Sequence, residues 1–416
     1  MQLLNKLFNI KKKLIGNNEF VEFMESNFSA NVHKFKSGTE VYDWVIPKKW
    51  NVKRGILKDS KNNIVLDYDI NNLNILTYSQ SYKGKISKKE LEEHLFYKED
   101  LPDSIPWMHS YYSSNWGFCL TKNMYDTLSD EYYYVDIETE FEDDFLNIVE
   151  LKINGKSDKE VILTTYICHP YMASDNVSGM YLLLKLYDAL KDKELKYNYR
   201  FLFFPETIGS LTALSQELVK PDNVEYSLIS TCVGFGDTIN YKKTFDGNHS
   251  IDNIIESLLN DYDDVDIREY WPDGGSDERQ FSSPKVRIPT GTIMRSPYGE
   301  YPEYHTSADN LDLISMEQMD EMVSIHKDVI LTYENYPKYE VCHDGGEPFL
   351  SKYNLYRSLG GTHKNYDTES IRNWILFLSD GKNNIKDISK KSDFTEDEIK
   401  KVVELLLSKN IIKEVQ

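Results

Sequence analysis

The chain has 416 residues, which exceeds what one hydrophobic core usually organises, so two or three domains are expected. Its 68 acidic and 48 basic residues give a formal charge of -20, which argues against a nucleic-acid partner and suits neutral or cationic small substrates. Apolar runs stop far short of the roughly 20 residues that a membrane helix needs. The first lysines follow the apolar residues instead of preceding them as in a signal peptide. The 4 cysteines show no CxxC spacing, so we expect a cytoplasmic protein with reduced thiols.

The first third of the chain predicts a helix at residues 20–27 and then a small β-rich domain over residues 43–149. Short strand-like runs, split by Gly, Asn, Asp and Pro, support that domain at residues 44–47, 63–66, 73–76, 116–120 and 132–135. The aromatic segment 109–118 is a candidate lining for a substrate pocket, although ordinary packing explains most aromatic residues in a chain that contains 13% of them.

Residues 161–167 are apolar and rich in β-branched and aromatic side chains, which predicts a short buried strand. His169 and Asp175 follow this strand, and apolar residues then recur at helical spacing up to Leu190. The intervening loop would open into the crevice where doubly wound sheets bind ligands. A plainer interpretation is that Asp175 only caps the helix and that His169 is a hydrogen-bonded loop residue.

Two later segments repeat this arrangement. Residues 199–205 predict a second core strand, which Glu206 follows directly, and His305 lies in a loop before a long helical pattern at residues 314–331. Two His, one Asp and one Glu are the residue types that a catalytic zinc site uses, with three protein ligands and one position left for water. A nearby carboxylate could then accept a proton from that water.

Four motifs carry a family resemblance: HPYMASDNVSG (169–179), PETIGS (205–210), GSDERQF (275–281) and EYHTSADN (303–310). In this order they resemble the aminopeptidase-like zinc exopeptidases, above all a bacterial branch linked with polysaccharide biosynthesis that carries an inserted domain and a C-terminal winged helix. The resemblance covers nearly the whole chain. It implies an α/β fold with a doubly wound mixed sheet over residues 1–42 and 150–345, the inserted β-rich domain over 43–149 and a winged-helix domain over 346–416.

The resemblance also implies roles for individual residues. His169, Asp175 and His305 match metal ligands of the two-metal members, and Glu206 matches their general base. The adjacent ligand glutamate of that family is replaced by Thr207, and the third strand ends in Thr231 and Cys232 where a further aspartate would stand. We therefore expect one zinc ion per chain, held by His169, Asp175 and His305. In the alternative assignment Glu206 is a fourth ligand, which would close the site and make it structural.

Substrate contacts are expected from Asp277 and Arg279 in the third motif and from Glu303 just before His305. Glu303 could bind a free α-amino group, or it could be a surface acid. Glu278 is expected to be a solvated charge, and Cys168 to be a buried structural thiol that points away from the crevice.

The last segment predicts a winged helix, with helices at residues 370–379, 385–390 and 395–408 and a strand from residue 411. Thr395 and Glu398 form a capping box at the third helix. Residues 368–416 contain nine basic and nine acidic residues, so the basic surface of a groove-binding domain is missing. We expect dimerisation or domain packing here rather than DNA binding.

Together these features predict a zinc-dependent aminopeptidase that cleaves an amide next to a free amine in a small peptide or amino conjugate. One alternative is an amidase or deacylase that acts on an amino-sugar or nucleotide-sugar conjugate. Another is a metal-binding scaffold protein that has lost catalysis.

Overall fold

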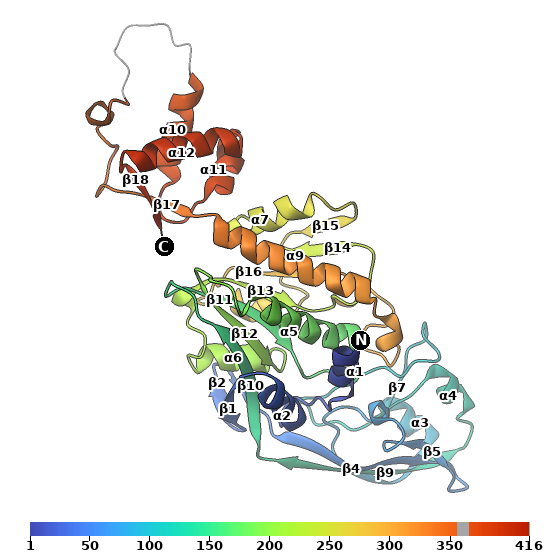
Figure 1. Cartoon of the computed structure of the whole chain (residues 1–416). Helices are drawn as coiled ribbons and strands as arrows, with labels where there is room; N and C mark the ends of the chain where they lie inside the picture. The colour runs from blue at the N-terminus through green and yellow to red at the C-terminus, as the bar shows by residue number, and fades with distance from the viewer. Residues whose placement is uncertain (356–365, 416) are drawn as a thin grey trace.

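An eight-stranded mixed sheet forms the centre of the computed structural model, which describes residues 1–355 and 366–415 (Figure 1). Its four central strands are parallel, in the order β12 (Asn198–Phe204), β11 (Glu160–Tyr166), β13 (Val224–Ser230) and β16 (Thr290–Met294). One edge is extended by β10 (Phe145–Ile153) and β1 (Asn31–Lys36), both in antiparallel pairings, and the other by β14 (Ile239–Lys242) and β15 (Val265–Arg268). The predicted mixed α/β sheet is confirmed.

Helices cover both faces of this sheet, which explains why the central strands are apolar along their whole length. In β11 and β12 every residue after the first is buried. One face packs against α1 (Gln2–Asn9), α2 (Asn18–Asn27), α5 (Gly179–Leu190), α7 (Ser250–Leu259) and α9 (Met316–Asn335). The other face packs against α6 (Ile208–Ser215) and α8 (Glu278–Phe281). Because the four central strands are parallel, their carboxyl ends lie together at one end of the sheet.

The inserted region builds a second, four-stranded antiparallel sheet with its own core, in the order β5 (Ile64–Asp67), β4 (Lys49–Lys58), β9 (Tyr132–Glu142) and β6 (Tyr82–Ser87) (Figure 1). Shorter elements accompany it: β2 (Glu40–Val41), β3 (Trp44–Val45), α3 (Lys88–Leu91), β7 (Leu95–Phe96), β8 (Phe118–Cys119) and α4 (Lys122–Thr127). Residues 73–76 were expected to be a strand, but a 3-10 turn occupies Asn72–Asn74 because the Asn71 side chain accepts a hydrogen bond from the Leu73 amide. The limits of the three domains stay a prediction.

The inserted region reaches the carboxyl ends of the parallel strands in the large sheet. Pro106 forms an isolated antiparallel bridge with Thr306, and the Trp107 amide donates to the His305 carbonyl over 2.7 Å. The Ile105 amide also donates to Ser307 Oγ over 2.9 Å. These bonds fix residues 105–107 directly beside the loop that carries His305.

The C-terminal region contains the predicted helices, α10 (Tyr366–Leu378), α11 (Ile385–Ser392) and α12 (Glu396–Ser408), and a two-stranded antiparallel sheet of β17 (Lys338–Val341) and β18 (Ile412–Val415). The capping box of Thr395 and Glu398 is confirmed. Helix α11 contacts α7, where Asp387 accepts hydrogen bonds from Ser250 Oγ over 2.6 Å and Asn253 Nδ2 over 2.5 Å. Within the described ranges, no helix is both long and apolar enough to cross a membrane.

A candidate metal centre at the carboxyl edge of the sheet

His169, Asp175 and His305 come together where the parallel strands end. His169 follows β11, Asp175 lies in the turn Ala173–Ser178 before α5, and His305 lies in the loop between β16 and α9. Each offers a ligand atom within 4.8 Å of the others. His169 Nδ1 is 3.5 Å from Asp175 Oδ1, and His305 Nε2 is 2.9 Å from Asp175 Oδ2. Asp175 does not cap α5, because the capping position belongs to Ser178.

The atoms that face one another in this cluster lie within ion-pair distance but form no aligned hydrogen bond. His169 Nδ1, Asp175 Oδ2 and His305 Nε2 are all buried and unpaired among the described residues. Buried polar atoms are normally hydrogen-bonded, so three converging exceptions require an explanation. Two imidazoles and a carboxylate are a donor set that suits zinc. The residues present therefore fit a single metal ion.

The charge state of Asp175 agrees with a ligand role. Burial opposes its ionisation, but His169 and His305 hold the pKa of its carboxyl well below the usual range. The Tyr166 hydroxyl also donates to Asp175 Oδ1 and lies 2.6 Å from Thr231 Oγ1. Thr231 thus supports Asp175 through Tyr166.

Asp309 fixes the loop that carries Asp175. Its carboxylate accepts hydrogen bonds from the Ser174 amide over 2.6 Å and from the Asp175 amide over 3.0 Å. Its backbone carbonyl accepts a third from the Ala173 amide over 3.0 Å. Sequence reasoning did not single out Asp309, although it belongs to the same motif as His305.

Trp107 forms an aromatic wall beside both histidines. Its ring centroid lies 4.4 Å from that of His169 and 4.8 Å from that of His305, in edge-on arrangements. On the same loop, the Tyr304 ring stacks on the His305 ring, with 3.9 Å between their centroids. Trp107 comes from the inserted region and was not predicted.

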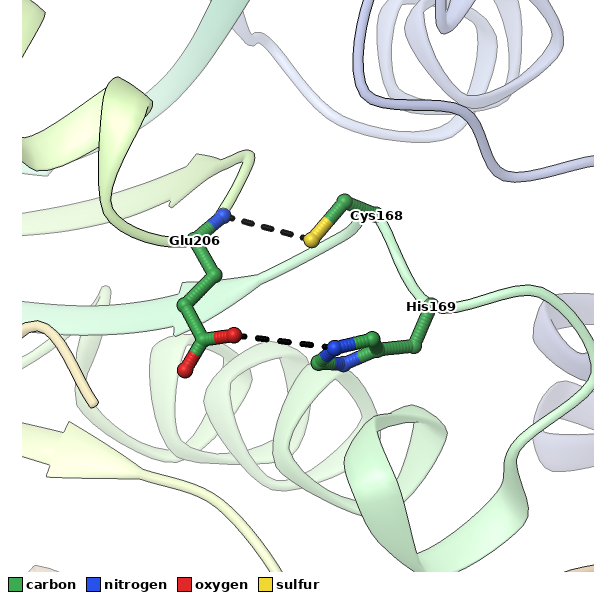
Figure 2. A group of neighbouring side chains, drawn as sticks. All are labelled: Cys168, His169 and Glu206. Atoms are coloured by element: carbon green, nitrogen blue, oxygen red, sulfur yellow. Dashed lines mark hydrogen bonds and ion pairs between the residues drawn. The ribbon is translucent and has the colours of Figure 1, made fainter. Parts of the chain in front are cut away.

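Glu206 lies on the other side of His169 (Figure 2). Its Oε2 is 3.6 Å from His169 Nε2, and its Oε1 accepts a hydrogen bond from Ser276 Oγ over 2.6 Å. The imidazole of His169 is therefore placed between two carboxylates, with Nδ1 toward Asp175 and Nε2 toward Glu206. Burial raises the pKa of the Glu206 carboxyl, while its side chain stays 26% exposed.

Cys168 is buried, as expected, but its thiol does not point away from the site. Figure 2 shows Sγ accepting a hydrogen bond from the Glu206 amide, over 3.3 Å. Cys168, His169 and Glu206 form a second group of side chains that could hold a metal ion. Burial raises the pKa of the Cys168 thiol far above its usual value, which disfavours the thiolate that metal ligation needs.

The third motif, residues 275–281, contacts Glu206 and the residue that follows it. Asp277 is fully buried, and its Oδ1 accepts hydrogen bonds from the Thr207 amide over 2.8 Å and from Ser210 Oγ over 2.5 Å. Arg279 is exposed, and Glu303 is half-buried beside the His305 loop. The expectation of a solvated Glu278 is wrong: its side chain is 0% exposed and forms an ion pair with the equally buried Lys242, at 2.9 Å.

Comparison with known proteins places this site in a family. A family described as a domain of unknown function, DUF4910, matches residues 1–336, and a winged helix-turn-helix family matches residues 338–414. The chain belongs to the DUF4910 family. This DUF4910 chain is 39% identical over 414 residues to a Clostridium acetobutylicum protein that is provisionally named a polysaccharide biosynthesis protein with an aminopeptidase-like domain, covering 99% of this chain and 95% of that one.

Solved structures agree with that assignment. The DUF4910 chain matches the crystal structure of a provisionally named peptidase from Clostridium acetobutylicum with a TM-score of 0.79 and 38% identity, over 100% of this chain and 95% of that one. It matches a zinc aminopeptidase from Bacillus subtilis with a TM-score of 0.58 and 14% identity, over 80% and 93% of the two chains. The resemblance to the aminopeptidase-like fold with a C-terminal winged helix is confirmed.

Proposed function

We propose that this DUF4910 protein is a single-metal zinc hydrolase of the aminopeptidase type, with His169, Asp175 and His305 as ligands and Glu206 as general base. The observation that carries the proposal is the convergence of three buried, unpaired ligand atoms at the carboxyl edge of the sheet. The aminopeptidase-like fold supports it, because relatives of this fold include a zinc aminopeptidase.

The surroundings of Glu206 suit a general base. A zinc ion, when bound, would act as a Lewis acid and lower the pKa of a water molecule. Glu206 uses Oε1 to accept the Ser276 hydrogen bond, whereas Oε2 accepts no hydrogen bond from a described residue, lies 3.6 Å from His169 Nε2 and can take up a proton. Its raised pKa strengthens it as a proton acceptor at neutral pH. Asp277 holds the Thr207 amide and Ser210, and so positions the turn after Glu206.

One ion per chain is the expected stoichiometry. By the motif resemblance, Thr207 and the pair Thr231 and Cys232 stand where carboxylates would complete a second site, and Thr231 contacts Tyr166. Glu303, next to the His305 loop, is our candidate for binding a free amino group of the substrate. Arg279 remains a candidate for a more distant substrate contact.

The test combines zinc analysis with turnover of aminoacyl chromogenic substrates by wild type and Glu206→Gln. We expect one zinc per chain in both proteins, and a loss of about 10²–10⁴-fold in turnover for Glu206→Gln, because the amide cannot accept the proton. Glu194→Gln, an exposed change with the same chemistry, serves as the control and should leave turnover unchanged. Two tightly bound ions, or wild-type turnover in Glu206→Gln, would overturn the assignment.

A second candidate is an amidase that acts on an amino-sugar conjugate. A cavity of about 780 Å³ next to His169 is lined by aromatic and amide side chains, among them Trp50, Tyr68, Asn71 and Asn72, which suit a sugar. A panel of N-acyl amino sugars, assayed beside the aminoacyl substrates, separates the two activities.

A further inference from the structure

The cavity of about 780 Å³ adjoins the candidate metal centre. Its wall includes Cys168 and Pro170, the two neighbours of His169, and Ser307, two residues after His305. It also includes Thr77, whose Oγ1 accepts a hydrogen bond from the Trp107 indole over 2.9 Å. The cavity therefore lies beside the candidate metal centre, although none of the three ligand residues lines it.

The charge of the cavity wall is opposite to that of the whole protein. The chain carries a formal charge of -20. Yet three consecutive lysines, Lys11 to Lys13, line the cavity against a single acidic residue, Asp69. A cleft lined by one sign of charge concentrates ions of the other sign, so this wall favours an anion.

Two of these ammonium groups have no acidic partner. Lys12 is 6% exposed, and its Nζ donates only to the carbonyls of Phe8 over 3.2 Å and Ile10 over 3.1 Å. Lys13 Nζ donates to Asn51 Oδ1, a neutral acceptor, over 2.9 Å. Across the described residues neither lysine forms an ion pair with a carboxylate. Burying a charge in this way is costly unless a partner of opposite charge arrives.

Helix capping explains only part of this arrangement. Lys12 follows the end of α1, so its contact with the Phe8 carbonyl is the favourable interaction of a cation with a helix C-terminus. Lys13 has no such contact and is held over the cavity by Asn51. Burial lowers the pKa of both lysines, and Glu19, which forms no ion pair with either ammonium, opposes the shift only in part.

We propose that the cavity is an anion-binding subsite in which Lys12 and Lys13 bind a phosphate or carboxylate group of the substrate. The identity of the bound molecule as a substrate rests on the proposed hydrolase function. The binding of an anion does not.

The test measures anion binding by calorimetry at low ionic strength, with inorganic pyrophosphate for phosphate groups and citrate for carboxylates. The most informative variant is Asn51→Asp, which keeps Lys13 but places a carboxylate where its ammonium is now bound. We expect at least one of the two probes to bind at one site per chain, and its Kd to rise at least about tenfold in Asn51→Asp and in Lys13→Gln. Lys61→Gln, an exposed change outside the cavity, is the control and should match wild type.

Thermal stability provides a second readout with the opposite sign. Asn51→Asp should raise the Tm, because it gives Lys13 an ion-pair partner, while it weakens anion binding. A substitution that merely damaged the fold would lower both the Tm and the affinity for the anion. Absence of saturable binding of both probes, or unchanged affinity in Asn51→Asp, would overturn the proposal.

The outcome is separable from that of the hydrolase assay. Binding is measured without turnover, and the same titrations in Glu206→Gln should give wild-type affinities. An inactive enzyme would therefore leave the anion result intact, and a cavity that binds no anion would leave the hydrolase assignment intact. Binding of pyrophosphate alone indicates a phosphorylated substrate, and binding of citrate alone indicates a carboxylated one.

Discussion

The candidate metal centre and the lysine-lined cavity are neighbours that lack partners of opposite sign. In the candidate metal centre, buried nitrogen and oxygen atoms of His169, Asp175 and His305 face one another at 2.9 and 3.5 Å without forming aligned hydrogen bonds. In the cavity, the ammonium groups of Lys12 and Lys13 are held only by neutral oxygen atoms. The sign of the missing partner thus indicates the class of ligand: a cation for the first region and an anion for the second.

The two regions also differ in how firmly their side chains are held. Asp175 is fixed by Tyr166 through its side chain and by Asp309 through its backbone. Lys13 depends on one hydrogen bond to Asn51. Metal ligation requires fixed geometry, whereas a flexible ammonium can adapt to an anion as a point charge. This contrast predicts steep effects of substitutions in the first region and graded effects in the second.

The largest effect is expected for His305→Ala, which removes one of three ligands. Zinc affinity should fall by more than the roughly 10–100-fold that is typical when a supporting residue is lost, and turnover should be lost with it. Competition with a fluorescent chelator measures the affinity. His33→Ala, which removes a histidine of β1 that lies 2.8 Å from Glu150, is the matched control.

The same His305→Ala protein also tests whether the two regions act independently. Its affinity for pyrophosphate or citrate should equal that of wild type, because His305 does not line the cavity that contains Lys12 and Lys13. Wild-type zinc affinity in His305→Ala would show that His305 is not a zinc ligand and would contradict the proposed metal centre.

A smaller effect is expected for Asp309→Asn, which acts through the backbone of the Asp175 loop. One of the two oxygens that accept from the Ser174 and Asp175 amides becomes an NH₂ group, which cannot accept. Zinc affinity should therefore fall about 10–100-fold, as for other residues that orient a ligand. Asp312→Asn, an exposed change three positions away, is the control. If both variants bind zinc like wild type, the loop is held by other contacts.

The convergence of the candidate metal ligands could be predicted from sequence because two of the site's residues follow strand ends. His169 follows β11 and Glu206 follows β12, and parallel strands bring their carboxyl ends to one edge. The C-terminal helices were equally predictable, because apolar periodicity and the capping box at Thr395 are local signals. His305 needed the motif resemblance, since no local pattern places its loop at this edge.

The remaining parts depend on contacts between distant segments. Trp107 meets His305 across about two hundred residues of sequence, and no periodicity encodes that contact. Strands β4 and β6 contain several lysines and polar residues that mask the alternation of a strand. Glu278 resembles a solvated charge until the fold brings Lys242 against it. A run of lysines is likewise typical of a solvated surface, and only the position of Asn51 shows that Lys13 is held over a cavity.

The pH dependence of stability provides a separate test of Lys12, in a quantity other than zinc affinity. Burial lowers the pKa of Lys12 from 10.5 to about 7 in the folded protein, although Glu19 opposes the shift. Between these two pH values the unfolded chain keeps the proton and the folded chain does not. The unfolded state thus binds more protons, and the free energy of unfolding should increase as the pH rises from about 7 to about 10, by up to roughly 1.4 kcal/mol per pH unit.

Lys12→Met removes the titrating group, so its free energy of unfolding should lack this increase, and at pH 7 and below it should equal or exceed that of wild type. Denaturant unfolding at several pH values measures the difference, with Lys61→Met as a control that should follow wild type. Saturating amounts of whichever anion binds should flatten the wild-type curve between pH 7 and 9, because a bound anion keeps Lys12 protonated in the folded state. If the anion binds but leaves the curve unchanged, then Lys12 only caps α1, and the anion is bound by Lys13 without it.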